Sequence, residues 1–270
     1  METPSDYPKI VYKYRSWDNP VHQRVLKFNE LFVSSPKNSN DPFDCRIPIN
    51  YSQLDTPEKI KRFVEFSTIK HFTYLVQNGT NLPEQMENLE DRLTNHISEF
   101  QKEHENILFE GQDKHYGILS LSAVWDNILM WSHYSNNHKG FCVGFWEEKL
   151  RNSELFGKGG PVRYSEDFPV LDPFKEDFID YSFTETHTKA KDWAYEMEYR
   201  LTKTFYPEIP TIEDRRFTIE NDVFAEIVLG LEIDSAHKQE IYEIARSKRI
   251  PIYESFKVPF KFLIDRREIV

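Results

Sequence analysis

The chain has 270 residues, of which 39% are hydrophobic, 29% charged and 15% aromatic, a composition typical of a packed globular protein and not of a disordered one. Its net charge of −11 argues against nucleic acid or an anionic membrane as a partner, unless a local basic groove binds it. Two distant cysteines, Cys45 and Cys142, exclude a disulfide scaffold and a zinc ribbon. No window approaches about 18 apolar residues and no basic start precedes an apolar segment, so we expect a cytoplasmic protein with no membrane partner.

The first part of the chain predicts two strands. Residues 10–16 alternate and are rich in β-branched and aromatic types, which favours a strand. An amphipathic stretch follows at 21–28, and a second, short strand is expected at 31–34. Residues 34–44 are dense in Ser, Asn, Asp and Pro, and they predict an ordered loop.

After this loop the pattern becomes helical. Thr56 is placed to cap the first helix, with Pro57 at its first position. Apolar residues at spacings of three and four continue on both sides of a break that contains Gly and Pro, which predicts a helical hairpin over 56–106. Because β-like segments lie on either side, we expect one α+β domain over 1–270 with a helical insert at about 55–112.

The second half of the chain predicts the rest of the sheet. Strands are expected at 117–122, 141–145, 162–165, 195–205, 224–231, 250–254 and 260–264, helical segments at 126–134 and 174–191, and a turn at 157–161. Asp234 or Ser235 caps a helix between two of these strands, which predicts a βαβ-like unit. The expected fold class is therefore α+β, with a mixed β-sheet core, an inserted helical hairpin and a C-terminal βαβ-like unit.

Several signatures of common enzyme classes are absent. The sequence has no P-loop, no GxGxxG after a strand, no GxSxG elbow, no HExxH and no paired CxxC. These absences argue against a P-loop kinase, a Rossmann dehydrogenase, an α/β-hydrolase and a zincin.

Four short blocks instead combine residue types that suit a binding or catalytic site, and two of them lie near the amino terminus. Arg15 ends the first strand, where its planar guanidinium suits phosphate or carboxylate, although a surface Arg is the simpler alternative. Ser34 and Ser35, at the end of the second strand, can bind a substrate hydroxyl or position a carboxylate. Asp41 and Asp44 are more simply interpreted as residues that form side-chain turns.

The third block is an aromatic helical face. Trp131, Tyr134 and His138 lie three and four residues apart, and His133 adds a second imidazole. This combination suits an aromatic ring of a substrate stacked beside an anion. A packed core or a plain surface face is the alternative interpretation.

The fourth block carries two carboxylates. On the strand predicted at 195–205, alternation places Glu196, Glu198 and Arg200 on one face, with neighbours about 7 Å apart. If that face lines a cleft, the glutamates form an acid–base pair or a pair that stabilises an oxocarbenium ion. If it faces water, they are solvated charges with weak pairing.

In this order, the four blocks resemble a widespread bacterial family of unassigned function. The resemblance rests on a KYR start, an NDPFD loop, a MWSHY…HKGFCVGF segment and a WxYExEYR strand. It covers most of the chain except the insert at about 55–112, and it implies no settled activity.

A second, more remote resemblance is to the Arg-Ser-Glu arrangement of mono-ADP-ribosyltransferases. It implies that Arg15 holds a phosphate or ribose of NAD, and that Ser34 and Ser35 support the catalytic Glu198. It also implies that this glutamate steadies the ribose cation as nicotinamide leaves. The aromatic stack over nicotinamide would come from Trp131, Tyr134 or Phe43.

Our leading hypothesis is therefore an intracellular ADP-ribosyltransferase-like enzyme or NAD glycohydrolase, such as a toxin or phage-defence effector that modifies protein or nucleic acid. Glu198 is the principal catalytic residue, Glu196 positions the acceptor, and His133 completes the catalytic set. Arg15, Ser34, Ser35, Trp131, Tyr134 and Arg200 bind the substrate. NAD is the expected substrate, and no metal is predicted.

Two alternatives stay open. A metal-dependent phosphodiesterase or nuclease would use Asp41, Asp44, His133 and Glu198 as ligands. A non-enzymatic ligand-sensing or protein-interaction module would use the helical hairpin over 56–106 to dock a partner or a second copy of the chain.

Overall fold

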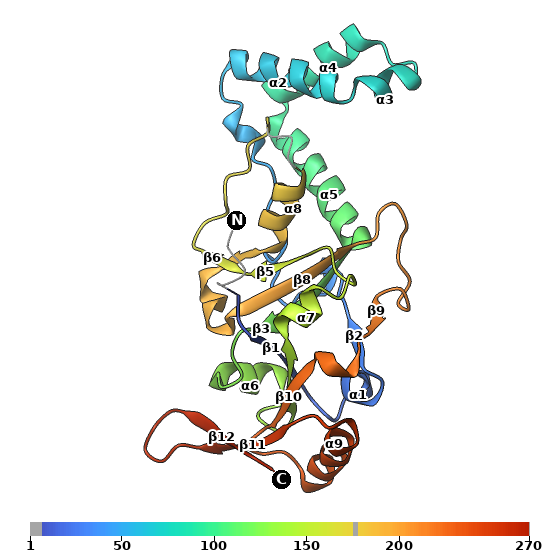
Figure 1. The fold of residues 1–270 in the computed structure, drawn as a ribbon. Helices are drawn as coiled ribbons and strands as arrows, with labels where there is room; N and C mark the ends of the chain where they lie inside the picture. Colours follow the sequence, from blue (N-terminus) through green and yellow to red (C-terminus); the bar gives the residue numbers. More distant parts are fainter. Residues whose placement is uncertain (1–6, 175–177, 270) are drawn as a thin grey trace.

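The computed structural model describes residues 7–174 and 178–269, and its centre is an eight-stranded sheet in the order β12-β11-β10-β4-β1-β3-β8-β5 (Figure 1). The strands are β1 (Ile10–Arg15), β3 (Tyr116–Ser122), β4 (Phe141–Trp146), β5 (Lys158–Pro161), β8 (Glu198–Thr204), β10 (Phe224–Leu229), β11 (Ile252–Lys257) and β12 (Ile264–Glu268). Among these described strands only β10 and β11 run parallel to each other. The predicted α+β class with a mixed sheet is confirmed.

Helices cover both faces of this sheet. The larger core includes buried residues of β1, β3, β4, β8 and β10, and α1 (Pro20–Lys27), α7 (Glu147–Arg151) and α9 (Ser235–Lys248) pack against it. On the other face, α6 (Ile128–Tyr134) packs Met130 and Trp131 against Tyr12 and Tyr14 of β1. Side chains from both cores therefore pack against β1, through Val11 on one face and Tyr12 and Tyr14 on the other.

β1 pairs very unequally with its two neighbours, which opens a space in the sheet. It pairs with β4 along its whole length, from Ile10 to Arg15, but with β3 only where Tyr12 lies opposite Ser122. The backbone of Ser34 instead pairs with the free edge of β3, where it exchanges two hydrogen bonds of 2.8 Å with Ile118. The loop after β2 (Glu30–Phe32) therefore enters the gap between the end of β1 and β3.

The C-terminal unit agrees with its prediction. Asp234 caps α9 by accepting hydrogen bonds from the backbone of Ala236 and His237, and this helix connects the parallel strands β10 and β11. The final strand lies later than expected, at Ile264–Glu268 and not at 260–264. The reason is that residues 258–263 form the turn between β11 and β12, in which Phe260 has a φ of 61°.

The helical insert forms an arm with its own core. Thr56 caps α2 (Pro57–Lys70) as predicted, by accepting a hydrogen bond from Lys59. The predicted hairpin is present but more divided than expected: α3 (Phe72–Gln77) follows α2 before the break, and α4 (Leu82–Asn95) and α5 (Ile97–His115) follow the break, with a second interruption at His96. In Figure 1, α2, α3 and α4 lie away from the sheet and α5 leads back to β3. The division into domains remains a prediction.

Three further segments differ from expectation. The turn predicted at 157–161 is strand β5, which can approach β8 closely because a Cβ on Gly159 would lie 2.3 Å from a Leu201 methyl carbon. The helical segment predicted at 174–191 is α8 (Phe178–Thr186) followed by β7 (Thr188–Ala190), with residues 175–177 outside the described chain. Strand 195–205 begins only at Glu198.

Two small sheets complete the fold. β2 pairs with β9 (Arg216–Thr218), and β6 (Arg163–Ser165) pairs in parallel with β7. No helix within the described part of the chain is both long enough and apolar enough to cross a membrane.

Candidate functional site

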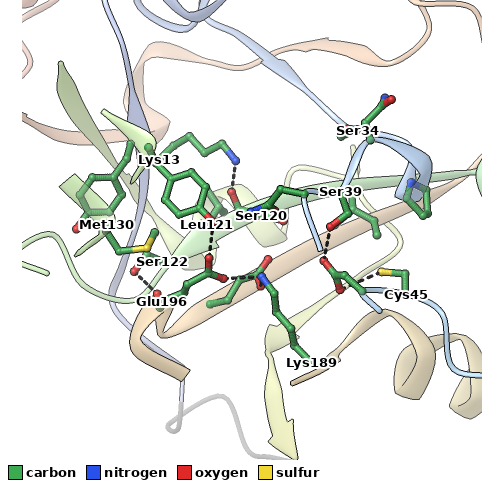
Figure 2. A pocket seen from close by; sticks show the side chains of 18 of the residues that line it. Lys13, Ser34, Ser39, Cys45, Ser120, Leu121, Ser122, Met130, Lys189 and Glu196 are labelled. Carbon is green, nitrogen blue, oxygen red and sulfur yellow. Dashed lines mark hydrogen bonds and ion pairs between the residues drawn. The ribbon is translucent and has the colours of Figure 1, made fainter. Parts of the chain in front are cut away.

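The gap between β1 and β3 holds a cavity of about 180 Å³. Its walls come from β1, β3, the loop over 34–45, α6, β7 and the segment that leads into β8 (Figure 2). These elements are far apart in the sequence. The unequal pairing of β1 is what leaves room for the cavity among them.

Most of the predicted site residues line this cavity. They are Arg15, Ser34, Ser35, Tyr134, Glu196 and Glu198. The expected convergence of four distant blocks around one cavity is therefore observed for these six positions, whereas Trp131, His133 and Arg200 do not line it.

Trp131 and His133 lie elsewhere because of the orientation of α6. Trp131 is fully buried, donates its indole hydrogen to the Trp125 carbonyl at 2.7 Å, and packs edge-on against Tyr14. His133 lies on the exposed side of the helix, where its ring contacts those of Tyr134 and Tyr195. The predictions that Trp131 stacks on a substrate and that His133 acts in catalysis are corrected by these placements.

Glu196 and Glu198 meet in the cavity, although not through strand alternation. Glu196 ends a 3-10 helix over Lys191–Glu196, and Met197 has a φ of 45°, so β8 starts only at Glu198. Lys189 joins the two carboxylates, with its ammonium 2.6 Å from Glu196 and 3.2 Å from Glu198. Figure 2 shows the side chains of Lys189 and Glu196 pointing toward each other.

Arg200 lies beneath the cavity and is fully buried. It binds both oxygens of Glu198, at 2.7 and 2.9 Å, and also Asp44 at 2.8 Å and the Thr186 carbonyl at 2.7 Å. All of its guanidinium nitrogens have partners, so the predicted role in substrate binding is wrong. Arg200 is a positioning residue that holds Glu198 and Asp44.

The two glutamates have opposite pKa shifts. Burial raises the pKa of Glu196, and this effect exceeds the opposing influence of Lys189. Burial acts in the same direction on Glu198, but Arg200 and Lys189 outweigh it and lower the pKa of this carboxyl to about 2. The hydroxyl of Tyr134 donates to Glu196 at 2.5 Å. Glu198 is therefore a permanent anion, whereas Glu196 is the carboxyl that can exchange a proton.

Lys13 and Arg15 bring positive charge to the cavity without carboxylate partners. Lys13 donates to the Ser120 carbonyl, and neither cation forms an ion pair with any residue in 7–174 or 178–269. Burial lowers the pKa of both groups, and for Lys13 the neighbouring Arg15 lowers it further, against the opposing influence of Glu198 and Glu196. Two partly buried cations that form no ion pair suit an anion such as phosphate.

The serines hold the loop in place and do not bind Glu196 or Glu198. Ser35 donates its hydroxyl to the Asp113 carbonyl at 2.7 Å and caps the short helix Pro36–Asn38. In Figure 2, Ser34 lies well away from Glu196. The resemblance assigns the support of Glu198 to Ser34 and Ser35. In the described part of the chain, Arg200 and Lys189 bind Glu198 instead.

Sequence reasoning missed three residues of the site. Lys189 was placed in a predicted helix, and no local signal marks it as the cation between two glutamates. Cys45 lines the cavity as a free, buried thiol. Lys13 could have been found, since it lies two residues before Arg15 on the same strand and therefore on the same face.

The four ligands of the metal-dependent alternative are not gathered. Asp41 accepts from the Phe43 backbone in a turn, Asp44 and Glu198 both bind Arg200, and His133 lies outside the cavity. No group of three or more metal-ligating side chains is arranged around one point in the described residues.

Comparison with known proteins gives one family match. No curated protein and no solved structure matches the chain. The matched segment contains Tyr134, Lys189, Glu196, Glu198 and Arg200, whereas Arg15 and the loop over 34–45 lie outside it. The match says nothing about the resemblance to mono-ADP-ribosyltransferases. It agrees with the expected family of unassigned function, since residues 130–201 match the family described as Protein of unknown function (DUF2971).

Proposed function

We propose that this chain is an enzyme that binds NAD and breaks the bond between nicotinamide and ribose, either by hydrolysis or by transfer of the ADP-ribosyl group to an acceptor. One observation carries the proposal: two cations that form no ion pair in the described residues, Lys13 and Arg15, share a cavity with the carboxylates of Glu196 and Glu198. An anionic substrate with a reacting ribose requires both kinds of group.

Binding begins with the pyrophosphate of NAD at Lys13 and Arg15. Burial of these two cations is unfavourable without an anion, so a phosphate that pairs with them is held strongly. The reacting ribose then lies toward Glu196 and Glu198, which line the same cavity.

Glu198 stabilises the transition state. When the bond between C1′ and the nicotinamide nitrogen breaks, the electron pair leaves with nicotinamide and positive charge develops on the ribose. Arg200, Lys189 and Ser120 all donate to the Glu198 carboxylate and hold it in place. Its fixed negative charge can then stabilise the ribose cation across the cavity.

Glu196 acts as the general base. Its raised pKa makes it a stronger base than an ordinary carboxylate, and the Tyr134 hydroxyl orients it. It accepts the proton from water or from an acceptor hydroxyl as the oxygen bonds to C1′. This assigns proton transfer to Glu196, in addition to its expected role in positioning the acceptor.

The wider role follows from the same chemistry. We place the enzyme in the reducing cytoplasm, where its free, buried thiols of Cys45 and Cys142 stay reduced, and where NAD is available. The acceptor would be a protein or a nucleic acid, as for a toxin or phage-defence effector. The arm formed by α2–α5 would dock that partner or a second copy of the chain.

The test is release of nicotinamide from NAD by the purified protein, measured by chromatography with water alone and with added protein or nucleic acid. We expect Glu198→Gln to reduce kcat by about 10²–10³-fold, because an electrostatic stabiliser is lost. Glu196→Gln should reduce kcat by about 10²-fold and remove the acidic limb of the pH profile. Glu254→Gln, in a partly exposed ion pair on β11, is the control and should leave kcat unchanged.

Each result has a definite meaning. Absence of nicotinamide with every acceptor, or full activity of a folded Glu198→Gln variant, would overturn the proposal. Thermal stabilisation by NAD without turnover would favour the ligand-sensing alternative.

A further inference from the structure

A second cavity, of about 300 Å³, lies next to the first. Lys189 lines both, and its neighbours Thr188 and Ala190 line the second. The remaining wall comes from residues 165–168, at and after the end of β6, and from Phe43 and Ile47. The two cavities therefore have the Lys189 side chain in common as part of their walls.

Two exposed phenylalanines line this second cavity. Phe43 is 62% exposed and Phe168 is 50% exposed, and their ring centroids lie 6.4 Å apart at an interplanar angle of 59°. Exposed aromatic rings on two separate loops leave apolar surface in water, which a flat aromatic ligand would cover.

Both rings are attached to elements of the first cavity. The backbone of Phe43 donates to Asp41 at 2.9 Å and accepts from Arg46 at 3.1 Å, which holds it in the loop that also carries Asp44 and Cys45. Phe168 follows β6, which pairs with the strand that carries Lys189. The relative position of the two cavities is thus fixed by the fold.

The two cavities differ in their charged groups. Lys13 and Arg15 have no ion-pair partner in the first, where Glu196 and Glu198 also lie, whereas Asp167 and Glu166, the latter paired with Lys191 at 2.5 Å, line the second. Lys189 directs its ammonium to Glu196 and Glu198 and so does not neutralise the second cavity. A phosphate is repelled there, but a planar ring with an amino group can donate to a carboxylate.

We infer that the second cavity binds the adenine ring of a nucleotide whose phosphate lies at Lys13 and Arg15. The inference rests on the proposed function for the phosphate site, and it goes further by assigning the base to Phe43 and Phe168. Stacking on these rings supplies affinity, and an acidic side chain at 166 or 167 favours a base that carries an amino group.

Calorimetric titration with adenosine 5′-monophosphate and with ribose 5-phosphate tests this assignment. We expect the first ligand to bind at least about tenfold more tightly, because only it carries a base. Phe43→Ala and Phe168→Ala should each weaken the affinity for adenosine 5′-monophosphate by about tenfold. The affinity for ribose 5-phosphate should stay within about twofold of its original value. Phe168→Tyr should keep most of the affinity, since the aromatic face remains.

The control is Phe72→Ala, which removes a similarly exposed ring from the helical arm and should change neither affinity. Equal affinity of the two ligands for the unmodified protein would overturn the inference, as would an equal loss for both ligands in the Phe43 and Phe168 variants. The outcome is independent of nicotinamide release. Base-dependent binding without NAD cleavage would leave the inference intact and reject the proposed function. NAD cleavage without base-dependent binding would support the proposed function and reject the inference.

Discussion

Arg200 shows how one side chain organises the buried charges of the site. It is fully buried and binds two carboxylates from different parts of the chain, Glu198 on its own strand and Asp44 in the loop over 34–45. A buried guanidinium is stable only when its donors are satisfied, and here they are. The residue therefore fixes the loop against β8 as well as the ionisation of Glu198.

We predict that Arg200→Lys destabilises the protein by about 2–4 kcal/mol, because one ammonium cannot satisfy both carboxylates in this buried geometry. Urea denaturation at neutral pH measures the change. Arg267→Lys is the matched control, since this Arg is 72% exposed in its pair with Glu254, and it should change stability by less than about 0.5 kcal/mol. Equal stability of the Arg200 variant and the unmodified protein would contradict the role given to Arg200.

At the scale of elements, the turn between α6 and β4 supports the end of β1. Asn136, Asn137 and His138 all have positive φ values, and the turn closes on Gly140. A Cβ on Gly140 would lie 2.0 Å from the Arg15 carbonyl oxygen. The glycine thus permits the close approach that places Arg15 at the cavity.

We predict that Gly140→Ala destabilises the protein by about 2 kcal/mol or more, because backbone atoms of β1 must move to make room. It should also weaken the binding of ribose 5-phosphate by several-fold, because Arg15 is displaced. Gly111→Ala on α5 is the control: nothing lies within 4 Å of its added Cβ, so it should stabilise the helix by about 0.5–1 kcal/mol. Urea denaturation and calorimetry measure both effects, and unchanged phosphate affinity in Gly140→Ala would argue against the link to Arg15.

At the scale of the whole molecule, the sheet and the helical arm have separate hydrophobic cores. The core of the sheet holds the cavity, whereas the core of the arm includes buried residues of α2, α4 and α5. We therefore expect α2 and α4 to open without unfolding of the sheet.

We predict that Leu93→Ala in the arm increases hydrogen exchange in α2 and α4 but not in β3 or β8. The removed side chain is 1% exposed, so the local cost is about 2–5 kcal/mol. Leu119→Ala in the sheet, which is equally buried, should increase exchange in the strands instead. Exchange by mass spectrometry resolves the two regions, and a uniform increase in the Leu93 variant would show that the cores unfold together.

Stability should also depend on pH through Glu185 of α8. Burial raises the pKa of this carboxyl to about 7 in the folded protein, from an ordinary value of 4.5. Between these two pH values the folded state binds the proton more tightly than the unfolded chain, so the contribution of this group to stability falls as pH rises and is fully unfavourable above 7.

We predict that Glu185→Gln stabilises the protein at pH 8 by on the order of 2 kcal/mol and gives no gain at pH 4, because the amide has no charge to bury. Denaturation in urea at both pH values provides the comparison. Glu65→Gln on the exposed side of α2 should change stability by less than about 0.5 kcal/mol at either pH. A gain at pH 4 as large as that at pH 8 would show that burial of charge is not the cause.

Elements that depend on local interactions were predictable from the sequence. The start of α2 follows from Thr56 and Pro57, and the start of α9 from Asp234, because a cap binds backbone groups within three residues of itself. The strand at 195–205 was not delimited correctly, because β8 begins where Ser122 of β3 provides a partner for Glu198. Alternation of residue types continues beyond the point where pairing stops.

The candidate site, like the fold, was predictable from the sequence only in part. Sequence alone determined which residue types were available for chemistry: a cation ending the first strand, serines after the second, and two glutamates near a third. Tertiary structure decided that Arg15 and Glu198 share a cavity, that Lys189 joins the glutamates, and that Arg200 lies below them. It also turned His133 outward. The physical reason is that the cavity exists only where β1 and β3 separate, and strand separation depends on contacts between segments more than a hundred residues apart, which no local pattern encodes.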